Sequence, residues 1–221
     1  MKTFWLKTGL FALALGIAGT ASADNNLGVG VKAGTLGIGV EGTWRPLPYM
    51  DIRVGANQYD YSDNGTYGGI LYDAEVNLDT YYATGNFRFP LSPFRVTAGV
   101  FSNGNEFSAV SGDNGAIIVV GGDPYPADAV GTVSSNASFA STSPYLGFGY
   151  DFTLLGTVGL NLDFGVLWQG SPEVSIAADG ILSGDPTFEA SLEAERLALE
   201  DDISNFKAWP VVSLGFVVNF L

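Results

Sequence analysis

Apolar and polar positions alternate along the last residues of the chain, from Pro210 to Leu221. A period of two residues is that of a β-strand, whose successive side chains point to opposite faces. One face of this segment is entirely apolar, whereas the other holds smaller or polar residues such as Ser213 and Asn219. Such a strand suits lipid on one side and a barrel interior on the other. The apolar face consists of Val212, Leu214, Phe216, Val218 and Phe220.

The same alternation recurs along the chain and predicts an all-β fold, a closed antiparallel transmembrane β-barrel of eight strands. Short and long connections alternate, as at the periplasmic and outer ends of outer-membrane barrels, and an even strand count puts both termini on the periplasmic side. The expected strands are Asn26–Ala33, Leu36–Arg45, Tyr49–Tyr61, Ile70–Phe89, Phe94–Glu106, Ser134–Thr153, Val158–Gln169 and Lys207–Leu221. The expected long outer loops are Ser62–Gly69, Phe107–Val133 and Gly170–Phe206.

The strand count depends on the first pair of strands. Its apolar face shifts by one residue near Gly34 and Thr35, and such a shift suits either a hairpin or a β-bulge. A hairpin leaves eight strands. With a bulge another strand must come from elsewhere, and Ile117–Val120 is the obvious candidate, which could also support a ten-stranded barrel. The shifting apolar face consists of Leu27, Val29, Val31 and Ala33, then Leu36, Ile38 and Val40.

One segment has helical rather than strand periodicity. Asp185 followed by Pro186 matches a helix N-cap with proline at the first helical position. Apolar residues then recur at helical spacing among many acidic ones, which predicts an amphipathic helix over Pro186–Asn205, inside the last outer loop. An apolar stripe usually packs, so we expect the helix to cover the barrel mouth. The alternative is a gate or a docking surface.

The N-terminal residues match a secretory signal peptide, 1–23. Lys2 and Lys7 form a positive n-region, Leu10–Ile17 is the apolar h-region, and Ala21–Ala23 is a small-residue cleavage site. The apolar run is shorter than the about 20 residues that a spanning helix needs. We therefore expect a mature chain, residues 24–221, that folds as a single barrel domain.

Alternation also assigns the charged residues of the strands to the lumen or to the lipid face. Near the bilayer midplane a lipid-facing Arg or Lys costs about 2–4 kcal/mol, so these charges are expected inside. Asp79 has the lipid-facing phase and must therefore lie above the bilayer. The residues expected in the lumen, five basic and four acidic, are Lys32, Glu41, Arg45, Asp51, Arg53, Arg88, Arg95, Asp151 and Asp163.

The lumen charges have two interpretations, which depend on the width of the barrel. In an eight-stranded barrel the side chains about fill the interior, so the charges would form a paired structural plug. In a wider barrel the same side chains would line an ion pathway.

Acidic residues dominate the remainder of the chain. The formal net charge is −14, and removing Lys2 and Lys7 leaves 7 basic against 23 acidic residues, or −16. Apart from Asp24 and the four lumen acids, all of them fall at outer strand ends or in outer loops, where only Arg196 and Lys207 oppose them. This excess argues against nucleic-acid binding. It hydrates the loops, or else it binds divalent ions that also bridge lipopolysaccharide phosphates.

The chain has no Cys and no His. Without His it lacks the commonest general base and the commonest metal ligand, so we expect no enzymatic activity, no cofactor and no metal site. Three Asp-containing stretches, Ser62–Gly65, Ser111–Gly115 and Ser183–Pro186, are typical of turns and do not match a calcium loop. Aromatic girdles are expected at the two interfaces, with Trp44, Tyr49, Phe87, Phe89, Phe94 and Phe152 at the short-turn ends and Trp168 and Trp209 towards the other ends.

The signal peptide, the alternating strands, the short PLP and PLSP turns and the C-terminal aromatic residue resemble those of small Gram-negative outer-membrane barrels, the broad OmpA/OmpX/OmpW-like group. The stretch VKAGTLGIGVEGTW also looks like the first hairpin of poorly characterised proteobacterial barrel proteins. The resemblance implies residence in the bacterial outer membrane, contact with its lipids and lipopolysaccharide, and recognition of the C-terminal strand by the barrel-assembly machinery. Leu221 departs from the usual terminal Phe. No substrate is implied.

Three functions are compatible with these features. The first is a non-enzymatic barrel with a charge-paired lumen and acidic outer loops, acting in envelope structure or surface interaction. The second is a narrow, cation-preferring channel for small solutes. The third is a surface adhesin. The strand number bears most directly on the choice, because it sets the width of the lumen.

Overall fold

The computed structural model describes residues 27–67, 70–111, 117–154 and 157–220, without the side chains of residues 66–72. The predicted signal peptide and Leu221 lie outside these residues. No helix in the described part of the chain is long and apolar enough to cross a bilayer.

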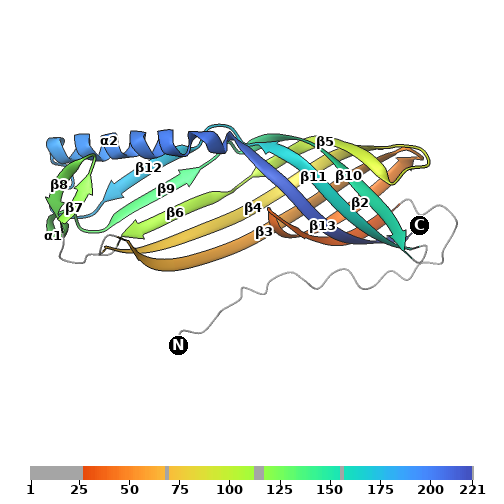
Figure 1. The fold of residues 1–221 in the computed structure, drawn as a ribbon, viewed down its shortest axis with the longest axis horizontal. Coiled ribbons are helices and arrows are strands. Elements are labelled where there is room, and N and C mark those ends of the chain that lie inside the picture. Colours follow the sequence, from red (N-terminus) through yellow and green to blue (C-terminus); the bar gives the residue numbers. More distant parts are fainter. Residues whose placement is uncertain (1–26, 68–69, 112–116, 155–156, 221) are drawn as a thin grey trace, which may run out of the picture.

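Eight antiparallel strands close into a barrel, which confirms the predicted fold class. Around the barrel each strand pairs with the next, and pairing of β4 with β5 closes the circle. Figure 1 shows the barrel strands crossing obliquely at one end of the molecule, with the C-terminus at that end. In their order around the barrel the strands are β1 (Leu27–Gly34), β2 (Gly37–Leu47), β3 (Met50–Tyr67), β4 (Ile70–Arg88), β5 (Phe94–Asn103), β10 (Thr142–Leu154), β11 (Val158–Trp168) and β13 (Ala208–Phe220).

The first two strands form a hairpin, so the bulge alternative and its extra strand are not needed. Gly34 pairs with Gly37, leaving a two-residue turn between them. Gly37 has a φ of +94°, a conformation that costs glycine little and other residues more. The segment Ile117–Val120 forms β7 in a separate two-stranded sheet with β8 (Asp123–Pro126), outside the barrel. The ten-stranded alternative is therefore wrong.

The alternation of the C-terminal strand has the predicted orientation. Val212 and Phe216 are 44% and 52% exposed, whereas Val211 and Val217 are buried inside. The same outward apolar face continues on the neighbouring strands, for example at Ile38 and Val54. A continuous exposed apolar surface of this kind is stable in contact with lipid and unfavourable in water.

The predicted outer loops contain a second sheet rather than irregular chain. The β3–β4 hairpin extends past the barrel through Tyr67 and Ile70, and three more strands follow beside β4, each paired with the one before it. We call this five-stranded continuation the extension sheet (Figure 1). Two predicted long strands are divided accordingly, because the chain leaves the barrel at Gly104–Asn105 and re-enters it at residues 139–141. The added strands are β6 (Glu106–Ser111), β9 (Val133–Ser138) and β12 (Glu173–Ala178).

The predicted helix is present as α2 (Pro186–Asp202), followed by the 3-10 turn η1 (Ser204–Lys207). The Asp185 carboxylate caps it by accepting hydrogen bonds from the backbone N–H groups of Thr187 (2.8 Å) and Phe188 (3.2 Å). The expectation that this helix covers the barrel mouth is wrong. It runs along the extension sheet and packs on β12 and β7, because its apolar residues meet a separate small core there. That core consists of Ile118, Val120, Ala127, Val130, Phe188 and Leu192, with residues of the short helix α1 (Ala127–Val130) among them.

Candidate functional site in the barrel lumen

Arg53 lies at the centre of the lumen and is 2% exposed. Its guanidinium contacts three carboxylates, Asp51 at 3.1 Å, Glu41 at 3.3 Å and Asp151 at 3.1 Å. Asp51 is on the same strand as Arg53 and Glu41 is on the neighbouring β2, whereas Asp151 is on β10, so that ion pair forms only when the barrel closes. An arginine presents five donors in a planar fork, which suits several carboxylates at once.

Arg95 forms the second centre of the network and is 1% exposed. Its guanidinium contacts Asp151 at 3.0 Å and also pairs with Asp163. Two neutral side chains complete its environment, because its Nη1 donates to Asn86 Oδ1 at 2.9 Å and to Thr97 Oγ1 at 2.6 Å. Asn86 also donates to Asp51 at 2.7 Å and so links the two arginine centres.

The structure places all nine expected residues in the lumen. Arg88 contacts Asp51 at 3.1 Å and pairs with Asp151. Lys32 lies 3.8 Å from Glu41. The Arg45 guanidinium donates to Asn219 Oδ1 at 3.4 Å. Charges from opposite sides of the lumen are thus brought together in one network of ion pairs and hydrogen bonds.

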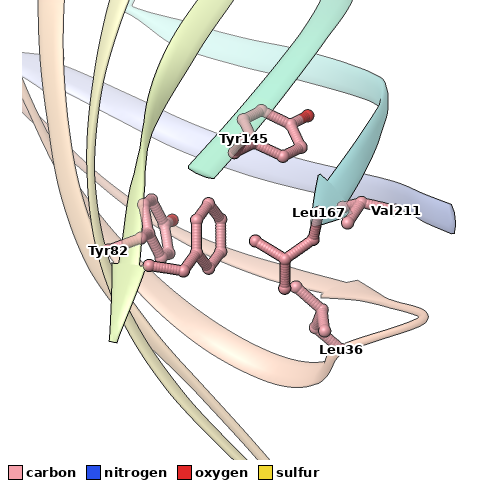
Figure 2. Packing of buried hydrophobic residues seen from close by; sticks show 6 residues of the cluster. Leu36, Tyr82, Tyr145, Leu167 and Val211 are labelled. Atoms are coloured by element: carbon pink, nitrogen blue, oxygen red, sulfur yellow. The ribbon is translucent and has the colours of Figure 1, made fainter. Parts of the chain in front are cut away.

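An apolar plug lies above this network, towards the end of the barrel that carries the extension sheet. Figure 2 shows its side chains pointing at one another across the lumen from several strands. The ring of Phe101 stacks on Tyr82 with centroids 4.9 Å apart and contacts Tyr145 at 5.2 Å. The plug consists of Leu36, Tyr82, Phe101, Tyr145, Leu167 and Val211, with Trp209 packed against it.

The inward phase of Phe101 and Val211 follows from the alternation of β5 and β13. Leu36 was expected on the lipid face, but it occupies the β1–β2 turn and is 4% exposed in the lumen. Trp209 was expected in an aromatic girdle, but it has the inward phase of β13 and contacts Phe107 instead. The inward phase of Tyr82 and Tyr145 was readable from the alternation of β4 and β10.

Tyr82 joins the plug to the charge network. Its hydroxyl donates a 2.7 Å hydrogen bond to Glu41, and the Lys32 ammonium lies 4.0 Å from its ring centroid. Gly55 makes room for this side chain, because a Cβ there would come within 2.5 Å of the Tyr82 hydroxyl oxygen. Small residues opposite large ones let side chains fill a narrow barrel.

A small recess lies beside these side chains. It has room for about one water molecule and is lined by Lys32, Glu41, Asn161 and Asp163 among others. Within the described residues no group of three or more Asp, Glu, His or Cys side chains is arranged to hold a metal ion. The site can hold the barrel in one register through paired charges.

Outside the barrel the charge is almost entirely acidic. Asp79 lies where the barrel ends, since β4 pairs with β5 up to Thr80 and with β6 from Asn77. On α2 the Arg196 guanidinium, 2.8 Å from Glu193, holds the pKa of that carboxyl below its usual value through a hydrogen bond. The acidic exterior expected of the loops is thus carried by an ordered sheet and helix.

Comparison with solved structures identifies the fold. CarO2 of Acinetobacter baumannii superposes with a TM-score of 0.59 at 21% identity, covering 88% of this chain and 98% of that one. CarO of the same organism superposes with a TM-score of 0.58 at 22% identity, covering 87% and 97%. The chain has the fold of a Gram-negative outer-membrane β-barrel. At this identity the likeness is one of fold alone, and no protein-family model and no curated protein matches the chain.

Proposed function

We propose that this protein is a non-enzymatic outer-membrane barrel whose lumen is a structural core and whose function lies in the extension outside, in envelope structure or surface interaction. The observation that carries the proposal is the packing of Arg95. This charge is 1% exposed and is satisfied by Asp151, Asp163, Asn86 and Thr97, as expected of a structural group. A pore-lining charge would instead face water.

The plug supports the same conclusion from a different direction. Three aromatic rings stand in contact across the lumen, and Leu36, Leu167 and Val211 fill the space beside them. A solute would have to displace these apolar side chains and then break the ion pairs beneath. Each buried ion pair that loses one partner costs about 3–5 kcal/mol, so a path through the barrel is unfavourable.

The proposal extends to the surroundings of the barrel. The exposed apolar face supports contact with outer-membrane lipids, and the acidic exterior supports contact with lipopolysaccharide through divalent ions. The C-terminal strand β13, with its outward apolar row, has the character of a segment read by the barrel-assembly machinery. We propose export through the inner membrane with cleavage after Ala23.

Planar-bilayer recording of the refolded protein tests the closed lumen. We expect no stepwise openings from the wild type, and regular openings selective for cations would establish the channel instead. In the variant Arg53→Gln with Arg95→Gln we expect conductance to appear or the heat resistance of the barrel to fall. The matched control, Arg196→Gln with Lys207→Gln, removes the same charge outside the lumen and should change neither. An unchanged Arg53/Arg95 variant would refute the paired core.

A further inference from the structure

The outer half of β3 has one free edge. Pairing with β2 ends at Ile38 and Gln58, whereas pairing with β4 continues without interruption to Tyr67 and Ile70. From Tyr59 to Tyr67 the strand therefore has β4 on one side and no strand on the other, within the described part of the chain. At about 3.3 Å per residue this edge is about 30 Å long. We call it the β3 edge.

The hydrogen-bonding groups of the β3 edge can be assigned from the register. Tyr49 accepts from Arg88 of β4 at 2.8 Å, and the register runs unbroken from there, so odd-numbered residues of β3 bond to β4. Alternation then directs the N–H and C=O groups of Asp60, Ser62 and Asn64 away from β4. The Asn64 N–H is consistent with this assignment, because it donates to the Asp63 carboxylate at 2.9 Å and not to β4.

The β3 edge lacks the usual protection against pairing with another strand. In native proteins lysine, proline or a β-bulge commonly prevents an edge strand from pairing with another chain. None of these lies between Tyr59 and Gly65. The protection that it does have is acidic, from Asp60 and Asp63. The sequence contains no Lys or Arg between Arg53 and Arg88. Two such edges would repel each other, which disfavours a second copy of this chain as the occupant.

The side chains along this edge differ between the two faces of the sheet. On the outward face Ser62 and Asn64 border a hollow of about 300 Å³ that is also lined by Asp73 and Glu75 of β4. On the other face Tyr59 and Tyr61 are 45% and 49% exposed. An added strand would place alternate side chains beside the acidic hollow and beside the tyrosine rings.

We propose that the β3 edge binds an extended basic segment of a partner protein or peptide by strand addition. Main-chain hydrogen bonds to Asp60, Ser62 and the Asn64 carbonyl provide binding, and alternation of Lys or Arg with apolar or aromatic residues provides specificity. The basic side chains lie beside Asp60 and the rim of the acidic hollow, and the apolar ones lie beside Tyr59 and Tyr61. This inference rests on the proposed function in one respect, that the protein acts through its exterior.

Binding of synthetic peptides to the refolded full chain tests the inference. The probe is a peptide of about nine residues in which Lys and Val alternate, matched to the length of the edge. Three controls have the same length: one with Lys and Val in separate blocks, one with alternate N-methylated amides, and one with Glu in place of Lys. We expect the alternating peptide to bind at least about tenfold more tightly than each control. If the peptide with separate Lys and Val blocks or the N-methylated peptide bound as tightly as the alternating one, charge attraction alone would explain the binding. That result would overturn strand addition.

Two variants locate the site. Ser62→Pro removes an edge N–H that is not bonded to β4, so it should weaken binding by about tenfold or more. Ser62→Ala, which keeps the edge N–H, is the matched control, and it should leave peptide binding unchanged. Should Ser62→Pro fail to fold, Ser62→Lys adds a repelling charge at the same place and should also weaken binding. Unchanged peptide binding in a folded Ser62→Pro or Ser62→Lys variant would overturn the proposal. A Ser62→Cys variant that forms a disulfide-linked dimer and binds no peptide would also overturn it, because the edge would then pair with a second copy of the chain.

Failure here is distinguishable from failure of the proposed function. If the protein shows no conductance and also binds no alternating peptide, only the inference about the β3 edge is refuted. If the protein conducts and also binds the peptide at the β3 edge, the proposed closed lumen is refuted and strand addition is supported.

Discussion

The hydroxyl of Tyr82 donates a 2.7 Å hydrogen bond to the carboxylate of Glu41, joining the apolar plug to the ion-pair network below it. Tyr82 comes from β4 and Glu41 from β2, and Glu41 in turn contacts Arg53 at 3.3 Å. One side chain thus takes part in both layers of the lumen. The plug and the network should therefore respond together when either is perturbed.

Removal of the Tyr82 hydroxyl measures this coupling. In Tyr82→Phe the ring still stacks on Phe101, but Glu41 loses a buried donor, so the free energy of unfolding should fall by about 1–3 kcal/mol. Urea titration of the refolded protein gives the value. The control Tyr61→Phe changes an exposed hydroxyl of the extension sheet and should leave the midpoint in place. Equal midpoints for wild type and Tyr82→Phe would show that the hydrogen bond contributes nothing.

Arg95 and Arg196 provide a contrast between buried and exposed ion pairs. Arg95→Met leaves Asp163 without its cation inside the lumen and should lower the free energy of unfolding by about 3–5 kcal/mol. Arg196→Met breaks pairs with Glu193 and Glu200 on the surface of α2 and should change it little, since solvent screens them. The same urea titration compares the two.

A double variant separates charge from packing at this site. Adding Asp163→Asn to Arg95→Met removes the stranded charge and should restore part of the lost stability. Similar losses for Arg95→Met and Arg196→Met, or no recovery in the double variant, would contradict the paired core.

Gly55 should not tolerate a side chain. In Gly55→Ala the new Cβ would lie 2.5 Å from the Tyr82 hydroxyl oxygen and 2.5 Å from the Val40 carbonyl oxygen, so the ring or the backbone must move. The cost of such overpacking is about 1–3 kcal/mol, readable as a lower melting temperature. Gly65→Ala, on the same strand, has no heavy atom within 4 Å of the new Cβ and serves as control. Comparable melting of the two variants would argue against tight packing around Tyr82.

The N-cap of α2 should control the local stability of the extension. Asp185→Ala removes the acceptor for the Thr187 and Phe188 N–H groups and should cost the helix about 1 kcal/mol. Hydrogen exchange of the α2 amides should speed up, while exchange in the barrel strands stays unchanged. Asp202→Ala, at the opposite end of α2, removes an acid that the helix dipole disfavours and should not speed exchange. Faster exchange throughout the barrel would mean that the extension and the barrel unfold as one unit.

Much of the barrel was predictable because its determinants are local. The row from Val212 to Val218 alternates with a period of two, and lipid on one side makes that period strict. The same rule assigned Arg53 and Arg95 to the lumen, since a charge on the lipid face would be costly. The cap at Asp185 was likewise evident, because it depends on residues a few positions apart.

The errors arose where tertiary contacts override the local pattern. Residues 62–67 were expected in a loop, but they continue β3, because β4 runs beside them as far as Ile70. Residues 134–138 were expected at the start of a barrel strand, but they pair with residues 106–110 in the extension sheet, far away in the chain. Leu36 follows an apolar row yet turns inward, because the two-residue hairpin leaves it over the lumen.

The sequence by itself determined the kind of barrel and the side of the strand on which each charge lies, because alternation between lipid and lumen is a property of consecutive residues. Only the tertiary structure decided which lumen charges form ion pairs and which side chains form the apolar plug of the barrel. The contacts of Arg95 with Asp151 and Asp163, and the meeting of Tyr82 with Phe101, join residues from different strands. Their distances follow from strand number and register, which are set when the sheet closes and not by any one segment.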